Sequence, residues 1–241
     1  MEEPKGAVWV PQCAALCLET MSYDFVLFET DGDPGNARFS KSPLTERIDF
    51  AEPATTPVLE SLAAGLGDTL PASIALEDEN PIQLSGDRCL YVATNYNDAE
   101  ATAAWLSEIA VDYGLGLADM NSDVILLFGD EDTDAVVQTD KFFSPGFSTF
   151  GLPHLLLEVM RLKDSVVPYL RVTRVEDDSH FIQTLYRTEE KNWLVELGTG
   201  AETAVRGTTV KTPKDVIALI NGWFNQATDF DAGHEWENVV E

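Results

Sequence analysis

The fold is decided by one stretch near the end of the sequence, Thr212-Pro213-Lys214-Asp215-Val216-Ile217-Ala218-Leu219-Ile220-Asn221-Gly222-Trp223-Phe224. Thr212 can cap a helix, Pro213 suits the first helical position, and Asp215 lies in the first turn, where the helix dipole favours negative charge. The apolar residues recur on one broad face, made of Val216, Leu219, Ile220, Trp223 and Phe224. Burying them at about 1.5 to 3 kcal/mol each requires a partner surface, so we expect this helix to cover a sheet.

Four segments rich in β-prone residues precede this helix and supply that sheet: 169–175, 181–187, 193–197 and 204–210. Short polar turns separate them, which predicts an antiparallel meander. Residues 235–240 can add a last edge strand, and the aromatic stretch 142–151 is expected to be a packed loop. The short apolar run 154–162 fits either a helix or a strand, because its periodicity does not decide between them.

The first half of the chain predicts strands and helices in the order β-α-β-β-α-β, which is typical of a ferredoxin-like module. The expected elements are a strand at 25–30, a helix with Thr56 as cap and Pro57 at its first position, strands at 72–76 and 89–94, a helix with Asn97 as cap that ends at Gly114, and a strand at 124–128. A short extended piece at 115–118 can precede the last strand. We therefore predict an α+β fold, with this module followed by a β-meander packed by one amphipathic helix.

The domain boundaries follow the charge. Residues 1–140 contain 27 acidic and 5 basic side chains, whereas 141–241 contain 15 and 10. The change falls at an acidic run, so we predict an α+β module at 21–128, an exposed acidic linker at 129–140 and a meander-plus-helix module at 141–241. Residues 1–20 are interpreted as an N-terminal extension, and both Met1 and Met21 remain candidates for the native start.

The composition excludes several classes of partner. The 241 residues carry a net charge of -27, which opposes binding to nucleic acids. No apolar run approaches the roughly 20 residues that a membrane-spanning helix requires. Three cysteines, Cys13, Cys17 and Cys89, indicate no disulfide framework, which fits a cytoplasmic protein. The oligomeric state does not follow from these data.

Motifs for metals, cofactors and catalysis are incomplete. A calcium loop that starts at Asp130 fails at Ala135 and Lys141, and His234-Glu235 lacks the second histidine of a zinc-protease helix. No phosphate-binding glycine motif occurs, so we predict no metal and no cofactor. An enzyme with its site between the modules stays an alternative, with His154, His180 or His234 as base.

Two tryptophans flanked by acidic residues, Trp193 and Trp236, are the candidates for partner contact, although packing of Trp193 in the core is the plainer interpretation. Aromatic anchors supply affinity and surrounding charges speed the encounter with a basic protein. The predicted contact residues are Asp177, Asp178, Glu189, Glu190, Trp193 and Trp236.

The C-terminal part also resembles the small immunity proteins encoded beside bacterial polymorphic toxins. The resemblance rests on Phe181-Ile182-Gln183, Trp193-Leu194-Val195-Glu196-Leu197, the helix at 216–224 and Trp236-Glu237. It implies a protein without catalytic residues that occupies the working face of a toxin. We therefore predict a non-enzymatic binding protein for a basic protein partner such as a toxin. A third alternative is that the acidic residues only keep the chain soluble at high salt.

Overall fold

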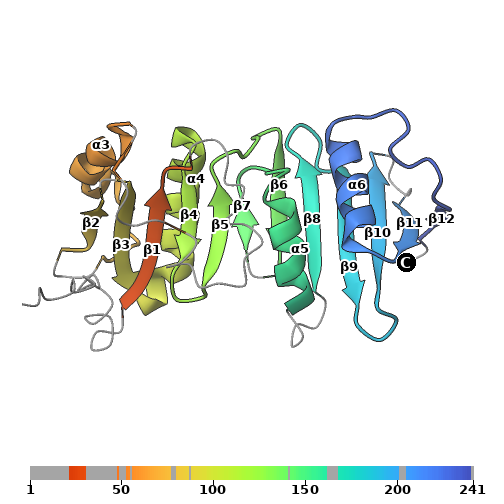
Figure 1. Ribbon diagram of the computed structural model, residues 1–241, viewed down its shortest axis with the longest axis horizontal. Helices are drawn as coiled ribbons and strands as arrows, with labels where there is room; N and C mark the ends of the chain where they lie inside the picture. Colours follow the sequence, from red (N-terminus) through yellow and green to blue (C-terminus); the bar gives the residue numbers. More distant parts are fainter. Residues whose placement is uncertain are drawn as a thin grey trace, which may run out of the picture.

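The computed structural model describes residues 22–30, 48, 53–54, 56–76, 80–86, 88–140, 142–161, 168–200 and 205–239. The fold is mixed α and β, with two antiparallel sheets that lie side by side along the long axis of the molecule (Figure 1). No helix in this part of the chain is long and apolar enough to cross a membrane. The predicted extension at 1–20 and Met21 lie outside the described residues.

The first sheet is built around β1 (Ser22–Phe28), which pairs with β3 (Cys89–Asn95) on one side and with β4 (Gly116–Asp119) on the other. β2 (Ile82–Ser85) lies next to β3, and β5 (Val124–Phe128) lies next to β4. The strand order is therefore β2-β3-β1-β4-β5, with all neighbours antiparallel.

Two helices pack on one face of this sheet, α3 (Val58–Gly65) and α4 (Ala99–Tyr113), each adjoining a short 3₁₀ turn, η1 (Leu66–Thr69) or η2 (Tyr96–Asp98). Gly114 ends α4 in the left-handed region at φ 63°, as predicted. The buried core between helices and sheet includes Phe25, Leu27, Leu59, Leu66, Leu90, Val92, Trp105, Leu106, Ala110, Leu117 and Leu127.

Four details of the first module differ from the prediction. Thr56 is not the cap of α3 and Pro57 is not its first helical residue, because Pro57 is the N-cap residue and the helix begins at Val58. The strand expected at 72–76 is only an isolated bridge between Leu76 and Thr94, and β2 forms at 82–85 instead. The piece expected before the last strand is β4, whose four residues are all buried next to β1. Asn97 does not cap α4, because it lies inside the 3₁₀ turn that precedes the helix.

The second sheet contains the predicted antiparallel meander. Its strand order is β12-β11-β10-β9-β8-β6-β7. In chain order the strands are β6 (Ala135–Thr139), β7 (Phe143–Ser144), β8 (Tyr169–Arg174), β9 (His180–Arg187), β10 (Asn192–Thr199), β11 (Val205–Val210) and β12 (Glu237–Asn238). β12 is the expected last edge strand, shortened to two residues.

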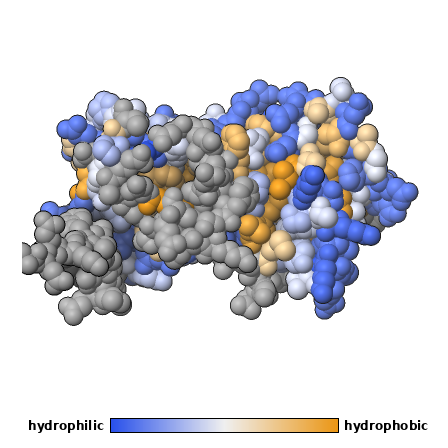
Figure 2. Space-filling model, in the orientation of Figure 1, coloured by the Kyte–Doolittle hydropathy of each residue, from blue (hydrophilic) through white to orange (hydrophobic). Residues whose placement is uncertain are grey.

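Two helices, α5 (Leu152–Arg161) and α6 (Pro213–Phe224), pack on one face of this sheet (Figure 1). Of the run left open by its periodicity, residues 154–161 are therefore helical. A capping box between Thr212 and Asp215 starts α6, as the sequence predicts. Figure 2 shows hydrophobic residues on the face where these helices lie, with hydrophilic residues near both ends of the strands. The core includes Val137, Leu156, Val172, Ile182, Trp193, Val195, Val216, Leu219 and Ile220.

The predicted acidic linker at 129–140 is wrong in its local structure, because β6 begins at Ala135 and lies inside the second sheet, between β8 and β7. The acidic residues before it form a hydrogen-bonded turn. Glu131 accepts from the backbone N–H groups of Phe128 and Gly129, at 2.6 and 2.9 Å, and Asp130 accepts from the hydroxyl of Ser148. The sequence-based prediction assumed that repulsion between the carboxylates keeps the segment extended. The N–H and O–H donors of the turn compensate that repulsion.

Candidate functional site: an acidic depression at one end of the second sheet

A depression of about 580 Å³ lies where the turn after β8, the start of β6 and the C-terminal end of α6 meet. We call it the acidic depression, because three of its seven lining residues carry carboxylates. The lining residues are Asp134, Arg174, Glu176, Asp177, His180, Trp223 and Gln226. Its volume is within the range of ligand pockets in proteins, and it is open to solvent on one side.

Arg174, the arginine that lines the acidic depression, contacts the C-terminal end of α6. Its guanidinium carbon lies 5.0 Å from the ring centroid of Trp223 and 4.9 Å from that of Phe224. Nη2 of Arg174 donates to the carbonyl oxygens of both residues, which are acceptors that the end of a helix leaves without an intrahelical partner. The guanidinium of Arg174 therefore supplies hydrogen-bond donors to carbonyl groups at the C-terminal end of α6.

Hydrogen bonds fix two of the three carboxylate residues in place. The backbone N–H of Val175 donates to the carbonyl oxygen of Asp134 at 3.0 Å. Oδ1 of Asp177 accepts from the hydroxyl and the backbone N–H of Ser179, and Oδ2 lies 2.9 Å from Nδ1 of His180. The bonds from Ser179, followed by the one from His180, hold the pKa of Asp177 below its usual value, so this carboxyl is ionised at neutral pH.

In the alternative that the protein is an enzyme, a histidine beside an acid acts as base, and His180 is the histidine that lies next to Asp177. Its side chain and that of Asp177 are 47 and 49% exposed, so water reaches both. His154 lies buried in α5 with its ring 5.6 Å from that of Phe128, and His234 follows α6, so the three histidines belong to three separate elements. Within the described ranges no group of three His, Cys, Asp or Glu side chains could hold a metal ion.

The structure places the predicted acidic contact residues at two ends of one strand. Asp177 lines the acidic depression, and Asp178 is exposed next to it, in the turn between β8 and β9. Glu189 and Glu190 are exposed in the turn between β9 and β10 (Figure 1). The eight residues of β9 separate these turns by about 26 Å, so the four carboxylates do not form one surface.

The two predicted tryptophan contacts have different surroundings. Trp193 is 1% exposed, with its ring 4.9 Å from that of Tyr186. A partner cannot reach it, so the prediction that Trp193 is a contact residue is wrong, because its strand directs the indole into the core. Trp236 is half-buried, donates from Nε1 to the carbonyl oxygen of Asp231, and has the guanidinium of Arg206 5.5 Å from its ring. It lies outside the lining of the acidic depression.

Sequence reasoning missed several residues of the depression. Glu176 directly precedes Asp177 and Asp178 in the sequence, so the same acidic run could have indicated it as a contact residue. Asp134 and Gln226 have no such signal, because only the pairing of β6 with β8 and the position of α6 bring them there. Comparison of the chain with protein-family models, with curated proteins and with solved structures gives no match.

Proposed function

We propose that this protein is a non-enzymatic binding protein that receives a cationic side chain of a basic protein partner in the acidic depression. The observation that supports this most is the balance of charge in the depression. Three carboxylate residues, Asp134, Glu176 and Asp177, line it against one arginine, Arg174, whose Nη2 donates to carbonyl oxygens at the end of α6. A lysine or arginine that enters from solvent would meet carboxylates, and the net charge of -27 would steer it there.

A toxin is the partner that the resemblance of the C-terminal part to immunity proteins suggests, and we retain it as part of this proposal. A location in the cytoplasm is proposed with it. We also propose a ferredoxin-like arrangement for the first sheet. Its order β2-β3-β1-β4 supports this, since β3 lies between β1 and β2 and the helices α3 and α4 each connect two strands that are not neighbours. β5 is then an additional strand.

The test uses titration calorimetry with a lysine-rich peptide whose C-terminus is amidated. The double variant Asp134→Asn/Glu176→Gln removes two carboxylates from the acidic depression, and we expect about a three- to tenfold loss of affinity. Added salt should weaken binding of the wild type, because it screens exposed charges.

The matched control is Glu189→Gln/Glu190→Gln, which removes the same charge at the other end of β9. It should bind the peptide as the wild type does. An equal loss in both double variants, or no binding at low salt, would show that the acidic depression is not a specific site.

A further inference from the structure

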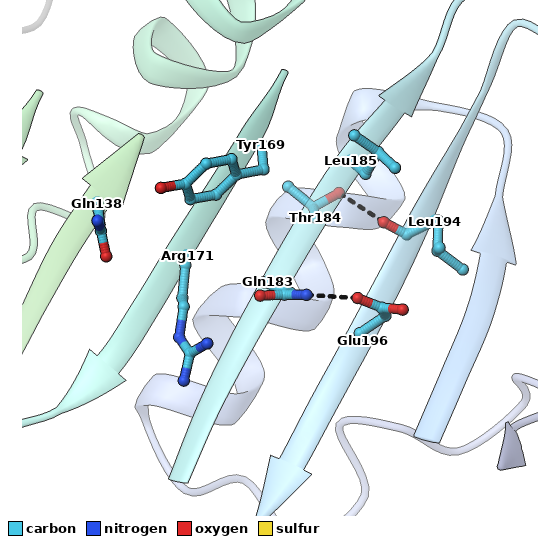
Figure 3. A pocket seen from close by; sticks show the side chains of 8 residues that line it. All are labelled: Gln138, Tyr169, Arg171, Gln183, Thr184, Leu185, Leu194 and Glu196. Atoms are coloured by element: carbon cyan, nitrogen blue, oxygen red, sulfur yellow. Dashed lines mark hydrogen bonds between the residues drawn. The ribbon is translucent and has the colours of Figure 1, made fainter. Parts of the chain in front are cut away.

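A second depression, of about 330 Å³, lies on the face of the second sheet opposite to α5 and α6 (Figure 3). Side chains alternate along a strand, so Leu170 and Val172 of β8 enter the core while Tyr169 and Arg171 point to the other face. We call this second site the sheet-face pocket. Its lining residues are Gln138, Tyr169, Arg171, Gln183, Thr184, Leu185, Leu194 and Glu196.

Four polar residues form one row across four strands of the sheet-face pocket. Gln138 pairs with Arg171, Arg171 with Gln183, and Gln183 with Glu196. The row therefore carries a cation on β8 and an anion on β10, with an amide between them. Two strand spacings, about 9.6 Å, separate the backbones that carry the opposite charges.

Arg171 is held in one orientation by its neighbours. Its guanidinium carbon lies 3.7 Å from the centre of the Phe181 ring, Nε donates to Oγ1 of Thr173 at 3.2 Å, and Nη2 donates to the carbonyl oxygen of Asp178 at 3.4 Å. A guanidinium has five N–H donors, and Nη1 contributes two beyond these contacts. Such a fixed guanidinium is suited to bind a carboxylate.

The amide of Gln183 is oriented as well. Its Nε2 donates to Oε2 of Glu196, and its oxygen points toward the β8 side of the pocket (Figure 3). Gln183 therefore offers an acceptor in the middle of the row, and Glu196 offers its second carboxylate oxygen. The two acceptors face opposite sides of the pocket, and the carboxylate of Glu196 is the one that lies away from Arg171 and can receive a cation (Figure 3).

An apolar row lies directly beside the polar one. Leu185 on β9 is opposite Leu194 on β10 and opposite Tyr169 on β8. The pocket thus combines a site for an anion, an apolar strip and a site for a cation.

We propose that the sheet-face pocket binds the end of a peptide chain whose C-terminal residue is arginine or lysine. The terminal carboxylate binds Arg171, with the amide of Gln138 and the phenol of Tyr169 as further donors. The aliphatic part of the side chain packs on Leu185 and Leu194, and its cationic group binds the second carboxylate oxygen of Glu196. The rest of the peptide leaves through the open side of the pocket.

The first experiment varies the ligand and leaves the protein unchanged. The probe is N-acetyl-glycyl-arginine with a free carboxylate, titrated into the full chain by calorimetry. Amidation of its carboxylate, or replacement of arginine by norleucine, should each reduce affinity at least about tenfold, because each removes one charge-assisted contact. Equal binding of the amidated peptide, or absence of binding at millimolar peptide, would overturn the proposal.

The second experiment varies the protein. Glu196→Gln should weaken binding of the arginine peptide and leave that of the norleucine peptide unchanged, and Arg171→Gln should weaken binding of both. Arg187→Gln, on the same face but held by Asn192 and Thr209 outside the pocket, is the matched control for the lost arginine. Glu189→Gln is the matched control for the carboxylate that Glu196→Gln removes. If Glu196→Gln binds both peptides like the wild type, the assignment of the cation site is wrong.

This inference does not depend on the proposed function, because the two sites share no residue. Asp134→Asn/Glu176→Gln should bind N-acetyl-glycyl-arginine normally, and Glu196→Gln should bind the amidated lysine-rich peptide normally. Failure of one proposal is thereby distinguished from failure of the other.

Discussion

The ring of Phe181 fills the space next to Gly198, its partner on the neighbouring strand, so closely that a Cβ atom at position 198 would lie 2.3 Å from Cε1 of Phe181. The same ring supports the guanidinium of Arg171 at 3.7 Å. The absence of a side chain on β10 therefore sets the position of an aromatic ring on β9, and through it the position of a cation on β8.

Replacement of Gly198 by alanine should displace the Phe181 ring and destabilise the fold by about 1 to 3 kcal/mol, the usual cost of overpacking. Urea unfolding measures the free energy of unfolding. The affinity of Gly198→Ala for N-acetyl-glycyl-arginine should also be lower than that of the wild type. Gly67→Ala is the control, since a Cβ atom there meets nothing within 4 Å. Equal stability of the two variants would contradict the packing described for Phe181.

Glu131 should make stability depend on pH. Burial raises its pKa to about 7, although hydrogen bonds from the backbone of Phe128 and Gly129 oppose the shift. The folded chain then keeps the proton to higher pH than the unfolded chain. The free energy of unfolding should therefore fall as the pH rises from about 4.5 through about 7, by at most about 3 kcal/mol.

The measurement is urea unfolding of the wild type and of Glu131→Gln at several pH values between about 5 and 8, the range set by the raised pKa. The difference in unfolding free energy between the two proteins should change with pH in this range. The control is Glu108→Gln, at an exposed position. Its unfolding free energy should change with pH as that of the wild type does. A constant difference for Glu131→Gln would refute the raised pKa.

The cap of α6 should contribute measurably to the stability of the second module. Oγ1 of Thr212 accepts from the backbone N–H of Asp215 at 3.2 Å, and Oδ2 of Asp215 accepts from the backbone N–H of Thr212 at 3.3 Å. Thr212→Ala should cost about 1 kcal/mol in thermal or urea unfolding. Thr188→Ala, in the exposed turn after β9, should leave stability within about 0.5 kcal/mol of the wild type.

The two tryptophans of the C-terminal part should respond differently to removal. Trp193→Ala empties a fully buried position and should cost about 3 to 5 kcal/mol of stability. Trp236→Ala should cost less, because that indole is only half-buried. Binding of the lysine-rich peptide to folded Trp236→Ala should equal that of the wild type, and a clear loss would place Trp236 in the partner surface.

Local signals account for what the sequence predicted. The last helix carries its cap, its first-turn proline and its apolar face within thirteen consecutive residues, and the meander strands are separated by polar turns. β6 was missed because the acidic residues before it dominate the composition of 129–140, while the burial of Ala135 and Val137 comes from pairing with β8. β2 was missed because a four-residue strand with no fully buried residue has little periodicity.

The two pockets could be predicted only in small part. The acidic run at 176–178 marked one side of the acidic depression, but its other residues come from β6 and α6, which are distant in the sequence. The row of the sheet-face pocket depends on strand register, and a shift of one residue would send its polar side chains to the opposite face. Register follows from the complete set of strand pairs, which composition and periodicity do not supply.

The two-residue length of β12 has a consequence for self-association. An exposed border strand can template the addition of strands from other molecules, which is how amyloid-like growth begins. Only Arg206 and Gly207 of β11 face Asn238 and Glu237 in the ladder, and Glu237 places a negative charge there. β12 itself therefore offers an incoming chain few backbone groups and an electrostatic penalty, so we expect that fibril formation does not start from β12.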